Sequence, residues 1–219
     1  MDSKVVNKAI RRSIWSTLKE ASFSKFTPRT AWRYTEEQVE VVNFQSFNRY
    51  NADVLGITTF SFAVNLGSFL LYVPPRWPPK VKDGKQVPEE SACQFRGRLT
   101  RTISQAHKHS DIWLVDGDGR NLGWCMRDVD RQLRQATRWF ERLRDKKEVL
   151  RILLTDSEQM GTLWGFGTNQ SPIRSYLSGY VALRLGQREI AEAKLHEAAE
   201  SKCFTHLFSS VEGAMTRAL

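Results

Sequence analysis

Two stretches of the chain alternate between apolar and polar residues with a period of two, which predicts two β-strands. In the first, residues 39–47, the side chains of Val42 and Phe44 point to one face and those of Asn43 and Gln45 to the other. One face of this strand is therefore expected to be apolar, and the other face is expected to carry amides.

The second stretch, residues 60–66 with a continuation to Val73, separates its side chains more cleanly. One face carries Phe60, Phe62, Val64 and Leu66, and the other carries Ser61, Ala63, Asn65 and Gly67. This separation predicts a half-buried antiparallel strand packed on helices. Shorter strands are expected at residues 23–34, as an edge strand around Pro28, and at residues 93–103.

Two segments instead follow the helical period of about 3.6 residues. The first begins at Ser3, a residue suited to cap a helix, and is expected to end near Ser22. Its apolar stripe consists of Val6, Ile10, Ile14 and Leu18. The second spans residues 125–144, and its apolar sector consists of Val129, Leu133, Ala136, Phe140 and Leu143. Each helix is therefore expected to turn one face toward a core.

Five arginines follow one another on the opposite side of the 125–144 helix, and we call this row the arginine ridge. It consists of Arg127, Arg131, Arg134, Arg138 and Arg142. One interpretation is an ordinary solvated face, because Asp130 and Glu141 flank the ridge and compensate part of its charge. The other is a binding surface, because arginine grips carboxylates and phosphates in bidentate fashion.

The connection after the second strand is far longer than usual and contains Pro74, Pro75, Pro78 and Pro79. We call residues 74–88 the proline-rich arm. Either the arm is a solvated insertion between strands, or it presents a set of aromatic and basic side chains to a partner. That set consists of Trp77, Lys80, Lys82 and Lys85.

The C-terminal part of the chain changes character after a glycine-rich junction at residues 161–172. Two helical patterns follow, at residues 176–185 and 187–201, and a last helix is expected at residues 204–219. The pair resembles a single tetratricopeptide unit, in which two antiparallel helices approach closely. The residues at the matching spacings are Gly179, Ala182, Gly186, Ala191, Leu195 and Ala198.

One such unit is too short for a free-standing solenoid, so the hairpin is expected to pack on the sheet domain or on a second copy of the chain as a homo-oligomer. The sequence thus predicts an α+β fold with a mostly antiparallel sheet packed against helices. We expect this sheet-and-helix domain at residues 1–160 and a C-terminal helical extension, the hairpin and last helix, at residues 161–219.

Composition narrows the class of protein. Lys and Arg number 33 against 24 Asp and Glu, and the resulting net charge of +9 favours an acidic or polyanionic partner. The three cysteines form no Cys-x-x-Cys pair, so neither a disulfide framework nor a zinc knuckle is indicated. No secretory signal and no membrane-spanning stretch is recognisable, so we expect a soluble protein of the reducing cytoplasm that binds no membrane.

Amide and arginine side chains gather on the polar faces of the predicted strands, and we call them the polar sheet face. They are Asn43, Gln45, Asn65, Arg96 and Arg98. These residues could line a polar pocket, or they could form an internal hydrogen-bonded ladder. The ladder is the favoured interpretation, because buried polar groups are usually hydrogen-bonded to one another.

His107, His109 and Asp111 form the most catalytic-looking constellation, since their spacing superficially resembles the His-x-His-x-Asp-His metal loop of metallo-β-lactamase-like hydrolases. However, residue 112 is Ile rather than His, and the preceding segment is polar rather than a buried strand. Two histidines in a solvated loop are therefore the favoured interpretation. We expect no catalytic residue, no cofactor and no metal, and a metal-dependent hydrolase is the least favoured function.

Residues 1 to about 150 resemble an uncharacterised bacterial family known as a domain of unknown function. The resemblance rests on Asn43-Phe44-Gln45, Asn65-Leu66-Gly67, Cys93 with Arg96 and Arg98, and Trp139-Phe140-Glu141. Ser22 stands where the family tends to glycine, and Arg138 stands where it tends to proline. The resemblance implies a compact α+β fold and brings no established activity.

Two functional hypotheses remain. In the first, the chain is a non-catalytic interaction protein of the immunity or accessory/defence type, and its ridge, arm and C-terminal hairpin contact an acidic protein partner. In the second, the ridge and arm grip a nucleic-acid backbone, with Trp77 available for stacking on a base. Salt separates the two, because binding to nucleic acid weakens steeply as salt rises, whereas an interface with aromatic anchors changes less.

Overall fold

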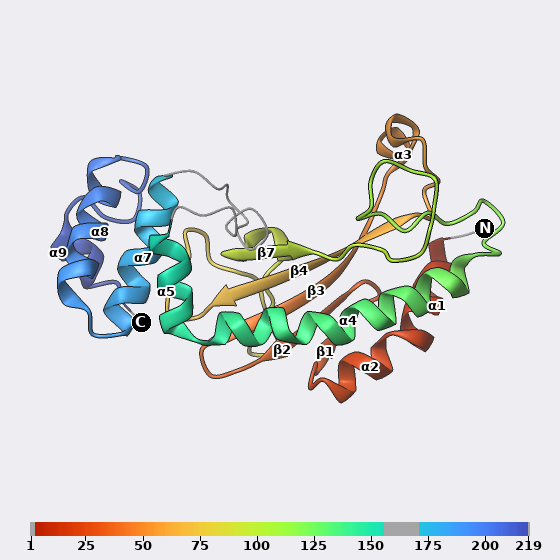
Figure 1. Ribbon diagram of the computed structural model, residues 1–219. Helices are drawn as coiled ribbons and strands as arrows, with labels where there is room; N and C mark the ends of the chain where they lie inside the picture. The colour runs from red at the N-terminus through yellow and green to blue at the C-terminus, as the bar shows by residue number, and fades with distance from the viewer. Residues whose placement is uncertain (1–2, 156–170, 219) are drawn as a thin grey trace. The chain divides into compact units, whose positions relative to one another are not determined.

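The computed structural model describes residues 3–155 and 171–218. Five strands form an antiparallel sheet in the order β1-β2-β3-β4-β7, and helices accompany it, which confirms the predicted α+β class (Figure 1). The strands are β1 (Lys25–Phe26), β2 (Thr30–Tyr34), β3 (Gln38–Ser46), β4 (Phe62–Leu70) and β7 (Phe95–Arg98). A separate two-stranded ribbon pairs β5 (Val81–Lys82) with β6 (Lys85–Gln86).

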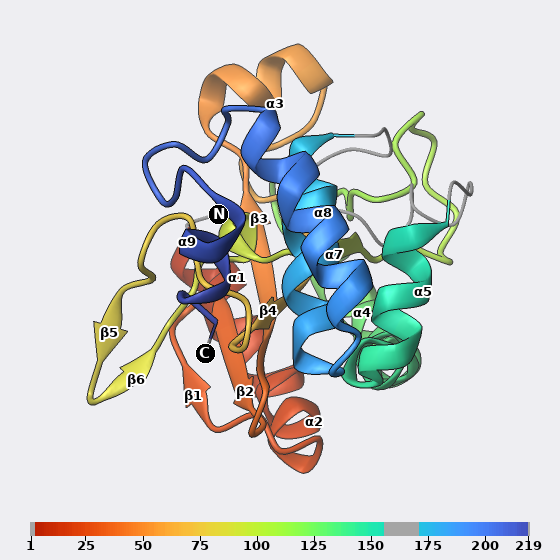
Figure 2. The same ribbon diagram turned by 90° about the vertical axis from the view of Figure 1, so that its left-hand side faces the viewer.

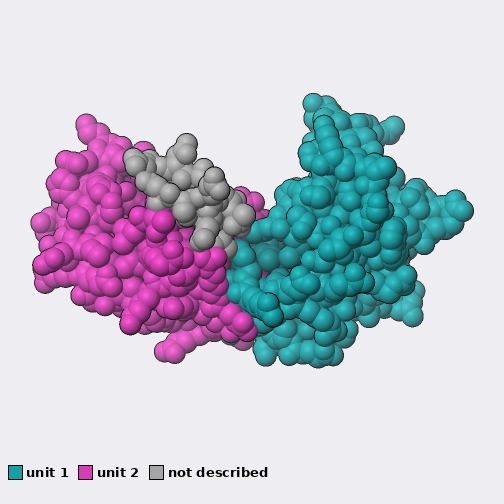
Figure 3. Space-filling view, in the orientation of Figure 1, with its two compact units in different colours: residues 1–34, 40–67, 97–139 teal, residues 35–39, 68–96, 140–219 magenta. Residues whose placement is uncertain are grey.

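The chain divides into two compact units (Figure 3). Unit 1 consists of residues 1–34, 40–67 and 97–139, and unit 2 consists of residues 35–39, 68–96 and 140–219. The predicted domain boundary at residue 160 and most of the glycine-rich junction lie outside the described residues.

Helices are present in both units. Those that begin in unit 1 are α1 (Ser3–Ser13), α2 (Trp15–Glu20), α3 (Arg49–Leu55) and α4 (Leu122–Arg144). Those of unit 2 are the 3-10 helix η1 (Glu90–Ala92) and the α-helices α5 (Lys146–Leu154), α7 (Pro172–Arg184), α8 (Arg188–Glu200) and α9 (Val211–Met215). Helices α7 and α8 lie side by side in both ribbon views, as predicted for the C-terminal hairpin (Figure 2).

The core of unit 1 is a row of aromatic rings between α2 and the sheet. Trp15 lies 5.7 Å from Phe44, Phe44 lies 5.7 Å from Phe62, and Phe62 stacks on Trp113 at 5.9 Å, all measured between ring centroids. On β7, Gly97 leaves room for the ring of Trp139, because a Cβ there would lie only 3.1 Å from it. The apolar face predicted from the alternation is thus the face that packs against α2.

The N-terminal helix was expected to run unbroken to Ser22, and this expectation is wrong. The structure has two helices, α1 and α2, separated at Ile14. The predicted apolar stripe is nevertheless buried throughout, and the break accommodates Trp15, which contacts Phe26 at 5.3 Å and Phe44. Tertiary packing of one large ring therefore overrides the continuous helical period. Ser22 itself adopts a left-handed conformation, with φ of 67°.

The single edge strand expected at residues 23–34 is a hairpin of two strands, β1 and β2. The chain reverses between Thr27 and Thr30, where the Thr27 amide donates to the Thr30 carbonyl at 2.8 Å and the Thr27 hydroxyl accepts from the Thr30 amide at 2.9 Å. Pro28, which has no N–H to donate to a ladder, lies inside this turn. The edge position itself is confirmed, because β1 is the first strand of the sheet.

Strand β4 was expected to be half-buried, but all nine of its residues are buried. The face predicted to be polar is covered in part by a second apolar cluster, in which Ala63 packs with Phe47, Ala52 and Ile112. Asn65 on the same face is covered by hydrogen-bonded side chains. Alternation identified the two faces correctly but could not show that a loop and α3 would cover the second one.

Three further elements differ from the predictions. Strand β7 ends at Arg98 rather than Ile103, because the following segment turns away and is held by the side chain of Arg101. Helix α5, which Asp145 caps by accepting from the Lys147 amide at 2.9 Å, was not predicted. Helix α4 starts at Leu122, three residues earlier than expected, and its predicted apolar sector is buried.

The last helix was expected at residues 204–219, whereas α9 spans only Val211–Met215. Phe204 and Phe208 lie outside it, because their rings stack on Tyr176 at 4.6 Å and 6.1 Å instead of following a helical period.

The proline-rich arm contains the hairpin of β5 and β6, which extends from unit 2 in Figure 2. Its turn is Asp83-Gly84, and both residues have positive φ, as such two-residue hairpin turns require.

Candidate functional site

The arginine ridge lies on the exposed side of α4. Its members Arg127, Arg131, Arg134 and Arg138 are exposed, and Arg142 at the end of the helix is partly exposed. A groove of about 440 Å³ in unit 1 follows the first half of the ridge. It is lined by Ser13, Met126, Arg127, Asp130, Arg131 and Arg134.

The chain's own carboxylates neutralise part of the ridge. Arg142 is held closely by Glu148, with 2.7 Å between Nε and Oε1. Two other pairs are looser. Arg134 Nε lies 3.4 Å from Asp130 Oδ2, and Arg131 Nη1 lies 3.9 Å from Asp128 Oδ1. Arg127 and Arg138 form no ion pair with any residue that the structure describes. The free charge of the ridge therefore resides mainly on Arg127 and Arg138.

The acidic side chains beside the ridge also hold α4 in place. Asp130 accepts a hydrogen bond from the Thr17 hydroxyl of α2. Asp128 is 1% exposed and accepts from the Thr102 amide and from Trp113 Nε1, both at 3.0 Å. Burial by itself raises the pKa of Asp128, but the hydrogen bonds from Thr102 and Trp113 outweigh it and lower that pKa. The ridge is thus carried by a helix that is fixed on the core.

Glu148 gives this region a measurable pH dependence. A hydrogen bond from Arg151, followed by one from Arg142, lowers the pKa of Glu148 to about 2 against the opposing effect of burial. Because the pKa is depressed on folding, the pairing stabilises the protein above about pH 4.5 and is lost as the pH falls toward 2. We expect Glu148→Gln to destabilise the protein by at most about 1 kcal/mol at neutral pH and by almost nothing near pH 2. Thermal unfolding of both forms across this range measures the difference, and an unchanged difference at low pH would contradict the assignment.

The proline-rich arm presents its tryptophan to solvent. Trp77 is 72% exposed, and its one ring contact is a stack on His206 at 5.3 Å within the described residues. The base of the arm is fixed, because the Tyr176 hydroxyl donates to the Pro74 carbonyl at 2.5 Å. Lys80 pairs with Glu89 at 2.8 Å. Lys82 and Lys85 lie in the β5–β6 hairpin, so the predicted basic residues are all placed on or next to it.

The polar sheet face is a hydrogen-bonded network centred on Arg98. Its Nε donates to Asn65 at 2.7 Å, one Nη donates to Asp111 at 2.7 Å, and the other donates to Gln45 at 3.0 Å. Asn65 also donates to Gln45 at 3.0 Å. Asn43 is bonded separately, to the Thr30 hydroxyl at 2.9 Å. These contacts leave the central amides engaged with one another, while the Arg98 side chain that joins them stays partly exposed.

Arg96 is not part of this network. It pairs with Glu90 at 2.6 Å in unit 2, and the hydrogen bond that its Nε donates to Glu90 raises the pKa of Arg96. The alternation placed Arg96 and Arg98 on one face but could not tell which carboxylate each guanidinium would meet.

The three weak metal candidates are engaged in other contacts. His107 Nε2 lies 2.9 Å from the Leu55 carbonyl, and its Nδ1 accepts from the His109 amide at 3.2 Å. Asp111 binds Arg98; burial raises the pKa of Asp111, but the hydrogen bond from Arg98 and further contacts lower it overall. Among residues 3–155 and 171–218, no group of three or more His, Cys, Asp or Glu side chains is arranged to hold a metal ion.

Comparison with known protein families assigns residues 14–142 of the chain to one family. The sequence model of the family described as Domain of unknown function (DUF4304) matches residues 14–142. The chain belongs to this DUF4304 family. No curated protein and no solved structure matches the chain. The DUF4304 region contains the Arg98 network and most of the arginine ridge, whereas helices α7, α8 and α9 lie beyond it.

One organising residue of the DUF4304 region escaped the sequence analysis. The guanidinium of Arg101 donates to four backbone carbonyls, those of Ile112, Ile103, His107 and His109, at 3.0–3.3 Å. It thereby fixes the loop that carries both histidines. No sequence signal indicates such a role, because backbone acceptors are present in every residue.

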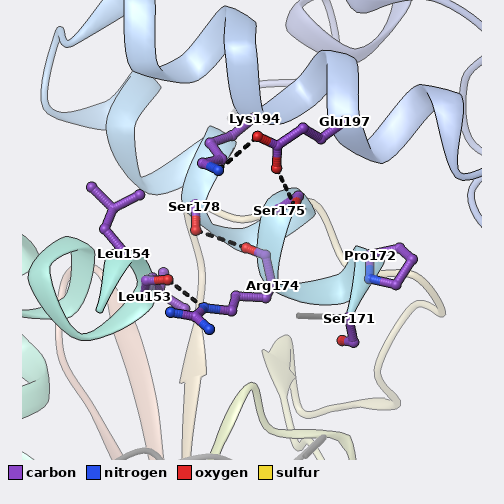
Figure 4. Close-up of a pocket in the computed structure, with 9 residues that line it drawn as sticks. All are labelled: Leu153, Leu154, Ser171, Pro172, Arg174, Ser175, Ser178, Lys194 and Glu197. Carbon is purple, nitrogen blue, oxygen red and sulfur yellow. Dashed lines mark hydrogen bonds and ion pairs between the residues drawn. The ribbon is translucent and has the colours of Figure 1, made fainter. Parts of the chain in front are cut away.

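Beyond the DUF4304 region, a cavity of about 440 Å³ lies where α5, α7 and α8 meet (Figure 4). Its polar side chains bind one another or the backbone. Arg174 donates to the Leu153 carbonyl at 2.5 Å, and Glu197 accepts from Lys194 and from Ser175, both at 2.7 Å. These contacts fasten the helices together.

No described helix of the chain is long and apolar enough to cross a membrane.

Proposed function

We propose that this DUF4304 protein is a non-catalytic interaction protein of the immunity or accessory/defence type that binds an acidic protein partner. The observation that supports it best is the pair Arg127 and Arg138, which stand exposed on α4 without an ion-pair partner among the described residues. Guanidinium groups in this state bind carboxylates in bidentate fashion at little cost in lost internal contacts.

The groove beside the ridge supports a protein partner in particular. It combines three arginines with Asp130, so it offers charge of both signs. The interleaved Asp128 and Asp130 add negative charge along the same helix. A uniform phosphate backbone would be repelled by these carboxylates, whereas a protein surface with mixed charge can match them.

The proline-rich arm, which belongs to unit 2, offers an aromatic contact of its own to the proposed partner. Trp77 is largely exposed, and tryptophan is strongly enriched among the residues that dominate binding energy at protein interfaces. Lys80, Lys82 and Lys85 would surround it with charge and increase the rate of association with an acidic partner.

The ridge is tested with a matched pair of double variants. A partner is first captured from the native host and identified by mass spectrometry. We expect Arg127→Gln with Arg138→Gln to weaken its binding by about tenfold or more, because both free guanidinium groups are removed. Arg49→Gln with Arg120→Gln removes the same charge from exposed positions elsewhere in unit 1 and is expected to change the affinity by less than about twofold. Titration calorimetry measures both, and equal losses in the two variants would exclude a specific role of the ridge.

The nucleic-acid alternative predicts a different result. Duplex and single-stranded oligonucleotides would then be retarded at low salt, and the logarithm of the affinity would fall linearly with the logarithm of the salt concentration. This outcome, together with the absence of any acidic protein partner, would replace the proposed function by backbone binding.

A further inference from the structure

Unit 2 contains an apolar cavity at the base of the proline-rich arm, with a volume of about 270 Å³. Its wall includes Phe69, Pro75, Trp77, Ile173 and Leu177. The DUF4304 match ends before the two helical residues among these, and neither the ridge nor the Arg98 network borders the cavity. Of the residues that line the cavity, the proposed function uses Trp77.

One charged side chain, Arg76, lines the cavity. Its guanidinium carbon lies 5.7 Å above the ring of Phe204, and its Nε is buried without a hydrogen-bond partner among the described residues. Among the residues that the structure describes, no acidic side chain lines the cavity. The two acidic residues that directly precede the lining residue Ser91 are already engaged, since Glu89 pairs with Lys80 and Glu90 pairs with Arg96. A buried donor on a permanently charged group is costly unless an acceptor reaches it.

The walls of the cavity are held in position by contacts within unit 2. The Tyr176 hydroxyl donates to the Pro74 carbonyl, and Gln94 accepts from the Leu70 amide at 2.8 Å. Tyr176 also stacks on Phe204, the ring under Arg76. The cavity is therefore preformed, and a ligand would not have to order its walls on binding.

We propose that this cavity binds a small organic monocarboxylate whose body is an aromatic ring or a branched aliphatic chain. The apolar body would pack between Trp77 and the side chains of Phe69, Ile173 and Leu177. The carboxylate would pair with the guanidinium of Arg76, which lines the cavity, and neutralise its charge. The volume is slightly below the range of about 300–1,000 Å³ typical of sites for drug-sized ligands, which selects a compact acid.

This site is independent of the arginine ridge, because the acid is bound by unit 2 alone. It shares Trp77 with the proposed protein interface. A free acid, rather than the C-terminus of a protein, is the occupant that we infer. The cavity is small and is bounded by the arm, so a single apolar group with its carboxylate fills it.

The probes are 3-phenylpropionate and its neutral amide, 3-phenylpropanamide, titrated into the full chain and followed by calorimetry or NMR. We expect the acid to bind at least about tenfold more tightly than the amide, since only the acid forms a charged hydrogen bond with Arg76. Arg76→Gln should remove this preference, whereas Arg120→Gln, a change of the same charge at an exposed site, should retain it. The comparison of acid with amide on the unaltered chain needs no variant and so does not depend on the folding of Arg76→Gln.

Three results with the acid and amide probes would overturn the proposal. They are the absence of saturable binding of the acid at millimolar concentration, equal binding of acid and amide, and an unchanged preference in Arg76→Gln. Tighter binding of a peptide that ends in phenylalanine than of the free acid would also overturn it, in favour of a protein terminus. Because the ridge variants are not involved, each of these results leaves the proposed protein interface to its own test.

Discussion

Replacing Arg33 with methionine is expected to lower the free energy of unfolding by about 3–5 kcal/mol, the cost typical of removing one partner of a buried ion pair. Arg33 on β2 is 7% exposed, and its partner Glu40 on β3 is 0% exposed. Arg33 also donates to the Ala21 carbonyl at 2.7 Å and lies 4.9 Å above the ring of Phe23. The substitution removes the guanidinium that pairs with the buried carboxylate of Glu40. Urea unfolding followed by circular dichroism measures the loss.

The double variant Arg33→Met with Glu40→Met is the control for this prediction. It removes both charges and fills the space with apolar side chains, so we expect it to recover most of the stability lost in the single variant. A single variant that unfolds at the same urea concentration as the unaltered chain would show that Glu40 finds another partner or water. A double variant no more stable than the single one would attribute the loss to packing rather than to the unpaired charge.

Replacing Gly179 with alanine is expected to destabilise unit 2 by about 2–3 kcal/mol, because the new methyl group has no room. A Cβ at this position of α7 would lie 2.6 Å from Cγ and 2.7 Å from Cδ2 of Leu195 on α8. Leu195 is fully buried, so its branch point cannot move aside without shifting the helix. Thermal unfolding of the variant measures the effect.

Gly213→Ala in α9 provides the matched control in the same unit. A Cβ there would meet its nearest neighbours, Ser210 and Phe208, at 3.5 Å and 3.6 Å, which are ordinary contacts. Alanine favours a helix over glycine by up to about 1 kcal/mol, so this variant should be as stable as the unaltered chain or more stable. If both substitutions had the same small effect, α7 and α8 would not be as closely packed as the distances indicate.

The sequence was sufficient to predict which face of a single strand or helix is buried, because apolar residues repeat with the period of that element. The face of β3 with Val42 and Phe44 and the apolar sector of α4 are buried as the alternation and the helical period required. The exposed position of the arginine ridge follows from the same helical period, because residues opposite a buried sector face solvent.

Contacts between distant residues were beyond such reasoning. The period assigns Asn65 and Arg98 to a face but does not identify Asp111 as the carboxylate that completes their network. The pairing of Arg33 with Glu40 was likewise missed, because an Arg and a Glu in strands are expected to be solvated unless their neighbours cover them. Arg76 gave no signal either, since its isolation depends on which residues surround it.

Local conformation was also decided by tertiary packing. Ser22 adopts a left-handed backbone conformation, which glycine would adopt without strain and which the sequence pattern did not reveal. Helix α5 was missed. The last helix was predicted too long, because Phe204 and Phe208 stack on Tyr176 instead of forming the apolar stripe of a helix.

The loop at residues 103–112 is organised around a single cation. Arg101 holds main-chain oxygens, and these are supplied by any amino acid, so the path of the loop does not depend on the identity of Lys108 or His109. Substitutions can therefore accumulate along its exposed positions during evolution while its course is retained. An exchange of Arg101 itself, even for lysine, would release the whole loop at once, because one ammonium group cannot span the four acceptors of a guanidinium fork.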